Sequence, residues 1–264
     1  MITIKDYKKV ASLEEAWELN QKKLNKIIGG MLWIKMTKGN VMTAIDMSGL
    51  GLNTIEETEE EFRIGCMVSL RQFEEHKGLD AYSNGAIKEA MRSIVGVQFR
   101  NLATVGGSVY GRFGFSDVLS VLHPMDAYVE MYKGGIIPLA EFMQMKYDRD
   151  ILVRVIIKKA KAKYCYQSVR IAKTDFPVPT CAAALNAEGV TIAVGARPGK
   201  AMLVKDEEKL VTLPITVEKA KAFAEYAAAK VPTSNTNRGS AEYRTHLVKV
   251  LAERAVMKLG GMAE

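Results

Sequence analysis

The amino-acid sequence predicts an α+β fold, on three observations. Strand-like and helical segments alternate within residues 13–50. Apolar and β-branched segments between residues 164 and 196 are typical of an antiparallel meander, and helical patterns dominate residues 217–259. With 264 residues, 48% of them hydrophobic and 25% charged, the chain is long enough for one large or two modest domains with buried cores.

In the N-terminal part, capping residues and glycines mark where the predicted helices and strands begin and end. Ser12 and Glu15 form a capping-box pattern, which predicts a helix from residue 13. The apolar run 26–28 predicts a strand that Gly29-Gly30 ends. The next elements are expected as a strand in 41–50, two strands around an acidic turn in 54–70, a helix that Ser69 caps, and a helix in 85–95.

The same kinds of pattern predict the elements after residue 116. A short helix and then a strand are expected in residues 116–132, and the near-continuous apolar run 151–157 predicts a buried strand. In the meander, residues 181–185 and 190–196 are the expected inner strands, around a turn at 186–189. Two helices, over 217–230 and 240–259, are expected to close the chain.

Several classes of protein are disfavoured. The charged first ten residues do not resemble a secretory signal, and no stretch approaches the roughly 20 apolar residues of a membrane span. The three cysteines, Cys66, Cys165 and Cys181, are far apart and form no C-x-x-C pair, which argues against a disulfide framework, a zinc site or an iron–sulfur cluster in this chain. A cytoplasmic, reducing location is therefore expected.

The net charge of +7 admits an acidic ligand, an acidic partner protein or nucleic acid. Much of the surplus lies in the run Lys158–Lys163, which is typical of a solvated basic face. No aromatic interleaving or nucleic-acid motif accompanies it, so nucleic-acid binding remains a remote alternative.

Two glycine pairs each follow a strand-like run: Gly29-Gly30 and Gly106-Gly107. Adjacent glycines permit positive φ and close backbone approach, so that consecutive N–H groups can face an anion such as a pyrophosphate. A single pair is usually a plain turn, but two pairs in similar contexts favour a binding function. Neither pair fits a P-loop or a G-x-G-x-x-G dinucleotide motif.

Other candidate residues are weaker. Asp117 can accept hydrogen bonds from ribose or ribityl hydroxyls, and Ser116-Asp117 equally reads as the N-cap of a helix. His76, His123 and His246 lack metal-ligand spacing, and no G-x-S-x-G elbow is present. The sequence therefore offers no local evidence for a metal site or a covalent hydrolase.

The segment FRNLATVGGSVYGRFGFSDVLSVLHPMDAYVEM (99–131) resembles the central motif of the FAD subunits of xanthine dehydrogenases, carbon monoxide dehydrogenases and related molybdenum hydroxylases. Three further segments resemble family motifs in the same order: KIIGGMLWIKM (26–36), EFRIGCMVSL (61–70) and RGSAEYRTHLVKVLAERAV (238–256). Together they span nearly the whole chain, and the length suits a separate flavin subunit.

The resemblance implies a two-subdomain FAD-binding fold of the vanillyl-alcohol-oxidase type. This domain is expected over residues 1–160, with subdomains of about 1–53 and 54–160. A smaller C-terminal α+β domain with a three-stranded antiparallel sheet is expected over 161–264. FAD is expected to lie between the subdomains. Because the chain has no cysteine cluster and has the length of a separate subunit, we expect it to bind FAD non-covalently and to contain no iron.

The resemblance also assigns residues. The first pyrophosphate loop would contain Ile27, Ile28, Gly29, Gly30, Met31 and Leu32, and the second Ala103, Thr104, Val105, Gly106, Gly107 and Ser108. Asp117 would contact the sugar chain, and Ile94 would pack near the cofactor. Met31 stands where the family usually has Thr or Ser, Ser108 where it has Asn, and RFGF replaces a proline-containing gap. One lost hydroxyl bond is worth about 0.5–1.5 kcal/mol, so weakened rather than abolished FAD binding is expected.

By the same resemblance, a molybdopterin-containing catalytic subunit oxidises the substrate and a [2Fe-2S] subunit passes electrons to FAD, with NAD as the transient final acceptor. A basic group near the flavin pyrimidine edge would stabilise its reduced form. Arg170 and Lys173 are the candidates, although either also fits a strand-surface charge. The alternative function is a structural or assembly subunit with a degenerate flavin site.

Overall fold

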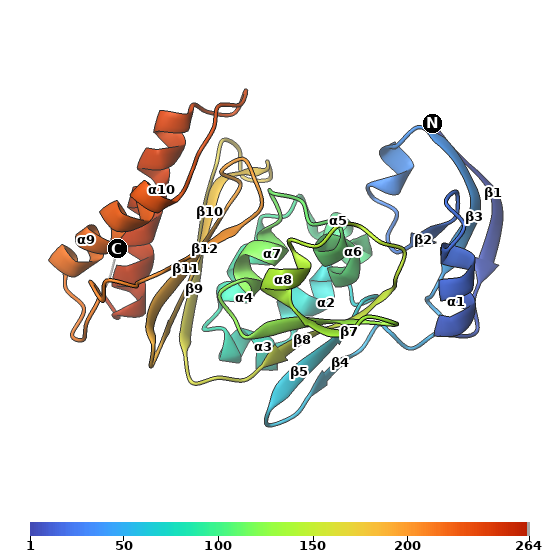
Figure 1. Cartoon of the computed structure of the whole chain (residues 1–264), viewed down its shortest axis with the longest axis horizontal. Coiled ribbons are helices and arrows are strands. Elements are labelled where there is room, and N and C mark those ends of the chain that lie inside the picture. The colour runs from blue at the N-terminus through green and yellow to red at the C-terminus, as the bar shows by residue number, and fades with distance from the viewer. Residues whose placement is uncertain (263–264) are drawn as a thin grey trace. The chain divides into compact units, whose positions relative to one another are not determined.

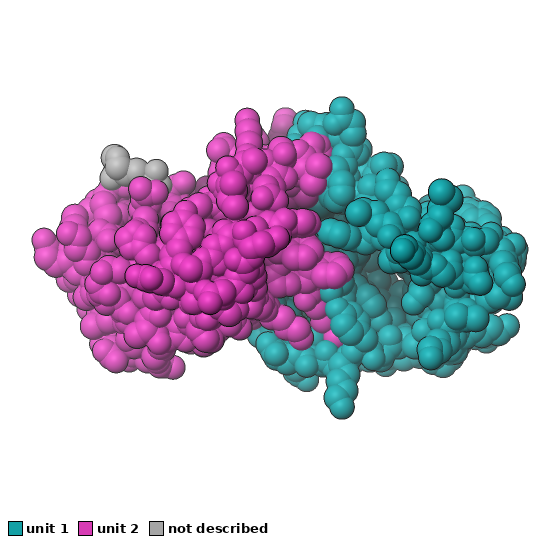
Figure 2. Space-filling model, turned by 90° about the horizontal axis from the view of Figure 1, so that it is seen from above, with its two compact units in different colours: residues 1–73, 97–111, 127–158 teal, residues 74–96, 112–126, 159–264 magenta. Residues whose placement is uncertain are grey.

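The computed structural model describes residues 1–262 of the chain. Its contacts divide it into two compact units, coloured in Figure 2. Unit 1 comprises residues 1–73, 97–111 and 127–158; unit 2 comprises 74–96, 112–126 and the chain from 159 onward. Residues 74–96 and 112–126, which the expected boundaries assign to the FAD-binding domain, thus group by contact with the C-terminal residues. The domain division at residue 160 stays a prediction.

Unit 1 begins with a three-stranded parallel sheet in the order β1-β3-β2. Ser12 starts the helix beside it, since its Oγ accepts the Glu15 N–H at 3.1 Å. The Glu15 carboxylate reaches back to the Ala11 N–H at 2.8 Å, one residue before the cap residue that a capping box uses. The elements are β1 (Ile2–Lys9), α1 (Leu13–Asn20), β2 (Lys26–Ile28), the 3-10 turn η1 (Ile34–Met36) and β3 (Gly39–Asp46).

The second sheet of unit 1 has five antiparallel strands in the order β4-β5-β8-β6-β7. The apolar run predicted as a buried strand forms its centre, β8 (Leu152–Lys158). Phe62 and Ile64 on β5 and Val155 and Ile157 on β8 are fully buried. The remaining elements are β4 (Ile55–Glu57), β5 (Glu61–Gly65), α5 (Val97–Leu102), α6 (Val105–Tyr110), β6 (Ala127–Met131), β7 (Gly135–Pro138) and α8 (Leu139–Phe142). The short helix α2 (Leu70–Glu75) follows β5 and runs across the boundary between the units.

Unit 2 is built on an antiparallel sheet in the order β12-β11-β10-β9. Figure 1 shows α9 and α10 on one face of it and α4 and α7 on the other. The first face forms a core in which Ile192 and Val194 pack with Phe223 and Leu251. The elements are α3 (Lys77–Tyr82), α4 (Ala86–Arg92), α7 (Asp117–Leu122), β9 (Lys163–Arg170), β10 (Pro177–Asn186), β11 (Gly189–Gly195), β12 (Met202–Lys205), α9 (Val217–Lys230) and α10 (Ala241–Leu259).

The expected three-stranded sheet was therefore one strand short. The fourth strand, β12, has four residues and follows the turn-forming Pro198-Gly199, so no alternating pattern marks it in the sequence. It pairs along β11 from Thr191 to Val194. None of the helices within residues 1–262 is both long and apolar enough to span a bilayer.

His123, directly after α7, gives the fold a specific pH dependence. Its side chain is buried, and burial lowers its pKa to about 4, against about 6.5 in an unfolded chain. The unfolded chain therefore binds the proton first as the pH falls, so this part of the stability is complete above about pH 6.5 and is lost toward pH 4. We expect a loss of about 2 kcal/mol in the free energy of unfolding between pH 7.5 and pH 5 from this group. Urea unfolding of wild type and His123→Gln at both pH values measures it, and equal pH dependence in the two proteins contradicts the assignment.

Candidate functional site

The two glycine pairs meet within unit 1. A Cβ built on Gly30 would lie 1.9 Å from the Leu102 carbonyl oxygen, and one on Gly29 would lie 2.9 Å from Thr104 Oγ1. The loop after β2 therefore lies against the backbone that leads into α6. Neither pair has positive φ, so glycine is required here for close approach rather than for a left-handed backbone, contrary to part of the expectation.

The residue that does adopt a left-handed conformation is Met31, at φ +57°. A side chain with a Cβ pays about 1–2 kcal/mol in this region, and β-branched residues are the least tolerated there. Threonine, the family's usual residue, would thus add backbone strain at this position together with its hydroxyl donor.

We expect Met31→Gly to raise the free energy of unfolding by about 1 kcal/mol and Met31→Thr to lower it, because only glycine relieves the strain at positive φ. Thermal and urea unfolding of the ligand-free proteins measure both effects. A Met31→Thr protein at least as stable as wild type would show that the loop does not hold this backbone conformation.

A cavity of about 450 Å³ lies where the two loops meet. Five of the predicted residues line it: Ile27, Gly29, Thr104, Gly106 and Gly107. The other loop residues do not, namely Ile28, Gly30, Met31, Leu32, Ala103, Val105 and Ser108. Val105 is fully buried in the core, and the Ser108 hydroxyl donates to the Thr104 carbonyl at 3.0 Å within the helix.

The N–H groups of the second loop are occupied by the protein itself. Val105 N–H donates to Val68 O at 2.8 Å, Gly106 N–H to Cys66 O at 2.9 Å, and Gly107 N–H to Thr104 Oγ1 at 3.1 Å. The expectation that these donors face an anion was wrong, because the loop packs on the turn after β5. In the first loop, by contrast, the N–H groups of residues 30–32 have no acceptor within residues 1–262. Successive free donors of this kind suit a diphosphate, so the first loop fits the cofactor better than the second.

Sequence reasoning missed several residues that line the cavity, including Lys26, Cys66, Tyr110, Tyr147 and Arg149. They come from four separate segments. Lys26, Cys66 and Tyr110 lie within the quoted family motifs but were not singled out, and no motif marks Tyr147 and Arg149. Burial raises the pKa of the Cys66 thiol to about 12, so it stays protonated and is a poor nucleophile at neutral pH. This chemistry agrees with a non-covalently held cofactor.

Arg149 joins two segments of unit 1 that are far apart in sequence. Its guanidinium donates to the main-chain carbonyls of Asn20, Lys22 and Asn25, at 2.8 Å for Lys22 and 3.1 Å for Asn25. In return, the Asn20 and Gln21 side-chain amides donate to the Arg149 carbonyl at 2.8 and 3.1 Å. The residues held in this way lead directly into β2, so Arg149 fixes the approach to the first glycine loop.

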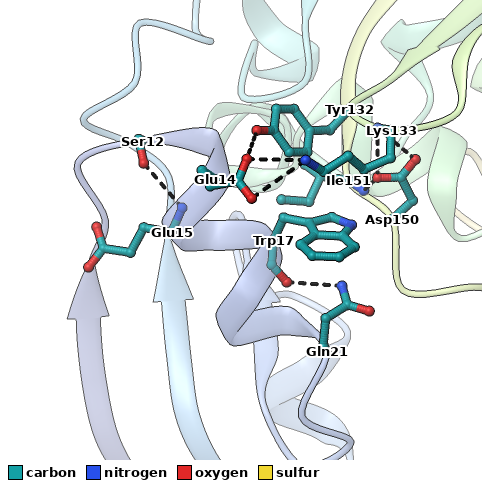
Figure 3. Close-up of polar contacts among 9 residues, drawn as sticks. All are labelled: Ser12, Glu14, Glu15, Trp17, Gln21, Tyr132, Lys133, Asp150 and Ile151. Carbon is teal, nitrogen blue, oxygen red and sulfur yellow. Dashed lines mark hydrogen bonds and ion pairs between the residues drawn. The ribbon is translucent and has the colours of Figure 1, made fainter.

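A second set of contacts holds α1 nearby (Figure 3). The Glu14 carboxylate accepts hydrogen bonds from the Tyr132 hydroxyl and from Lys133 Nζ, the latter at 3.1 Å. The same ammonium lies 5.0 Å from the Trp17 ring centroid, and the Asp150 carboxylate accepts the Lys133 N–H at 3.1 Å. The segment before the first glycine loop is therefore attached at two places, to the turn after β6 and to the residues before β8.

Asp117 and Arg170, singled out separately in the sequence, form a buried ion pair in unit 2. Their side chains are 6% and 7% exposed, and the Tyr166 hydroxyl donates to the same carboxylate oxygen. Burial raises the pKa of Asp117, and Arg170 and Tyr166 oppose that shift. Ser116 is the residue that caps α7, so Asp117 is free for the ion pair, and Arg170 is not a strand-surface charge.

The two remaining predicted residues lie elsewhere. Lys173 is exposed on the turn after β9 and forms no ion pair within the described residues, so the structure does not bring it to Arg170. Ile94 is half-buried just after α4 in unit 2. Within residues 1–262, no three His, Cys, Asp or Glu side chains converge as a metal site would require.

Comparisons with known proteins identify the family of the chain. Residues 3–160 match the family described as "FAD binding domain in molybdopterin dehydrogenase". The chain is 25% identical over 245 residues to YgfM of Escherichia coli K12, covering 91% of this chain and 90% of that protein. It is 25% identical over 276 residues to the nicotine 6-hydroxylase medium subunit of Paenarthrobacter nicotinovorans, covering 96% of each.

The fold matches that of a chain of carbon monoxide dehydrogenase from Hydrogenophaga pseudoflava, with a TM-score of 0.87, 20% identity and 98% of each chain covered. The matched family segment holds both glycine loops, the cavity between them and the Arg149 contacts. The chain belongs to the family of FAD-binding domains of molybdopterin dehydrogenases.

Proposed function

We propose that this chain is the FAD-carrying medium subunit of a multi-subunit molybdenum hydroxylase and relays electrons between its partners. The observation that carries the proposal is the convergence of both glycine loops on one cavity of unit 1, with free N–H donors on the first loop. The nicotine 6-hydroxylase relative, itself a medium subunit, agrees in length with this chain.

In the proposed site, the diphosphate lies between the loops, where Gly29 and Gly107 line the cavity and leave room for it. The N–H groups of residues 30–32, which follow Gly29 in the first loop, are its candidate donors. Bound FAD supplies the exchange between one-electron and two-electron chemistry. Arg149 holds the first loop in place through the carbonyls of residues 20–25. In unit 2, the buried ion pair with Asp117 fixes the orientation of the Arg170 guanidinium, which is the proposed basic group near the flavin.

The proposed partners are a molybdopterin-containing catalytic subunit and a [2Fe-2S] subunit, with NAD as the transient electron acceptor in a cytoplasmic complex. Purification of the tagged chain from its native source tests this. We expect stoichiometric molybdenum and iron in the co-purifying complex, with bleaching of the flavin absorption by NADH under anaerobic conditions. A complex that contains molybdenum and flavin but does not react with NADH would exclude NAD while leaving the subunit assignment intact.

The isolated chain is expected to bind FAD without a covalent bond, because Cys66, the cysteine in the cavity, stays protonated. Acid precipitation of the FAD-loaded protein should leave all flavin in the supernatant. Flavin that stays with the precipitated chain contradicts this expectation. A folded chain that binds no flavin at all would favour the alternative function, a structural or assembly subunit with a degenerate flavin site, which the occupied donors of the second loop also suit.

A further inference from the structure

A second cavity, of about 580 Å³, lies wholly within unit 2 and has no role in the function proposed above. Four segments form it: Gly114-Phe115, residues 196–200, Phe176-Pro177, and the turn before α10 with Arg244 of that helix. The backbones of the first two segments touch, since a Cβ on Gly114 would lie 2.5 Å from the Gly199 carbonyl oxygen. The Ala196 N–H also donates to Gly114 O at 2.8 Å. Backbone contacts between its segments therefore hold the cavity in shape.

The charges that line this cavity are all positive. Lys200, Arg238 and Arg244 contribute to its wall, and no Asp or Glu is among its described lining residues. Outside the wall, the Asp175 carboxylate forms an ion pair with Arg238 at 3.5 Å. A concave wall whose charged side chains are all cationic attracts anions.

Of the three cations, Arg244 gives the strongest evidence for an anion site. It is 2% exposed, and its two terminal nitrogens donate to Ala196 O at 2.7 Å and Thr236 Oγ1 at 2.6 Å. Its buried Nε has no hydrogen-bond partner within residues 1–262. Burial and the charge of Arg238 together lower the pKa of Arg244, so its positive charge is uncompensated in the ligand-free protein. A bound oxyanion would supply both the missing acceptor and the missing charge.

The rest of the wall is apolar and aromatic. Phe115 and Phe176 lie with their ring centroids 4.4 Å apart, and the Arg238 guanidinium lies 5.2 Å from the Phe176 centroid. Such a surface accepts a flat ring, and the volume exceeds what a free inorganic anion needs.

We propose that this cavity of unit 2 binds a small organic phosphate, with its phosphate on Arg238 and Arg244 and a planar ring against Phe115 and Phe176. Arg244, already fixed by two protein acceptors, orients the phosphate, while the less buried Arg238 and Lys200 add charge at the mouth. The site shares no lining residue with the glycine-loop cavity.

Calorimetric titration of the full chain with phenyl phosphate tests the proposal, because this probe has a phosphate monoester and a ring but does not resemble FAD. We expect saturable binding that inorganic phosphate displaces and phenol does not. Arg238→Gln should weaken binding about tenfold, as loss of a charge-assisted contact does. Arg254→Gln, which removes an exposed arginine of α10 outside the cavity, should leave binding unchanged.

Lys200→Gln provides a second variant, with an expected weakening of several-fold, should Arg238→Gln lower the melting temperature. No saturable binding would overturn the proposal, as would equal affinity in Arg238→Gln and Arg254→Gln. Binding of phenol as tight as that of phenyl phosphate would also overturn it, since the site would then recognise a ring and not an anion.

Discussion

Gly30→Val and Gly106→Val are expected to lose FAD affinity by on the order of 100-fold, because overpacking costs of about 3 kcal/mol fall directly on the cofactor loops. A Cβ at Gly30 would lie 1.9 Å from the Leu102 carbonyl oxygen, and one at Gly106 would lie 2.5 Å from the Cys66 carbonyl oxygen. Both obstacles are backbone atoms, so neither can be relieved by a side-chain rotation. The loops must move apart, and the cavity between them changes shape.

Flavin-to-protein ratios and FAD titrations of the purified variants measure this effect. Gly49→Val is the matched control in unit 1, because the nearest atom to its added Cβ is the flexible end of the Lys9 side chain. Circular dichroism establishes that each variant is folded before its affinity is compared. Wild-type affinity in folded Gly30→Val and Gly106→Val proteins would remove these loops from the flavin site.

Arg149→Ala is expected to destabilise unit 1 by about 2–4 kcal/mol, because it leaves several main-chain carbonyls in residues 20–25 without their donor. FAD affinity should fall as well, since the strand that leads into the first glycine loop loses its attachment. Urea unfolding and FAD titration provide the two readouts.

Lys146→Ala is the control for Arg149, as it removes an exposed cation from the same segment. Arg149→Lys distinguishes charge from geometry: one ammonium cannot reach all three carbonyls, so we expect it to restore only part of the stability. If Arg149→Ala is as stable as wild type and binds FAD equally well, the contacts of Arg149 do not position the loop.

The main elements of the fold could be predicted because their signals are local. Ser12 caps α1 through the bond that its sequence pattern indicates, and β8 forms where an apolar run is bounded by charged residues. The four-residue strand β12 could not be predicted, because its place in the sheet depends on pairing with β11 and not on its own pattern. The grouping of residues 74–96 and 112–126 with the C-terminal sheet likewise depends on long-range contacts.

Part of the candidate site could likewise be predicted from local patterns, and part depends on long-range contacts. The glycine pairs mark the two loops in the sequence, but which donors stay free depends on the turn after β5, whose carbonyls occupy the second loop. Arg149 is separated by more than 120 residues from the carbonyls it binds, so no motif could identify it. Asp117 and Arg170 were each singled out for a separate role, and only the structure shows that they form an ion pair with one another.

The measurement that tests the central claim most directly is the FAD-to-protein ratio of the purified, folded chain at saturation. Equilibrium dialysis of the ligand-free chain against FAD, followed by flavin and protein quantification, gives this ratio without any partner subunit. The proposed function predicts one FAD per chain, bound in competition with excess ADP because both molecules carry the diphosphate that we assign to the first glycine loop. A folded chain that retains no FAD at any concentration would contradict a flavin site in the glycine-loop cavity.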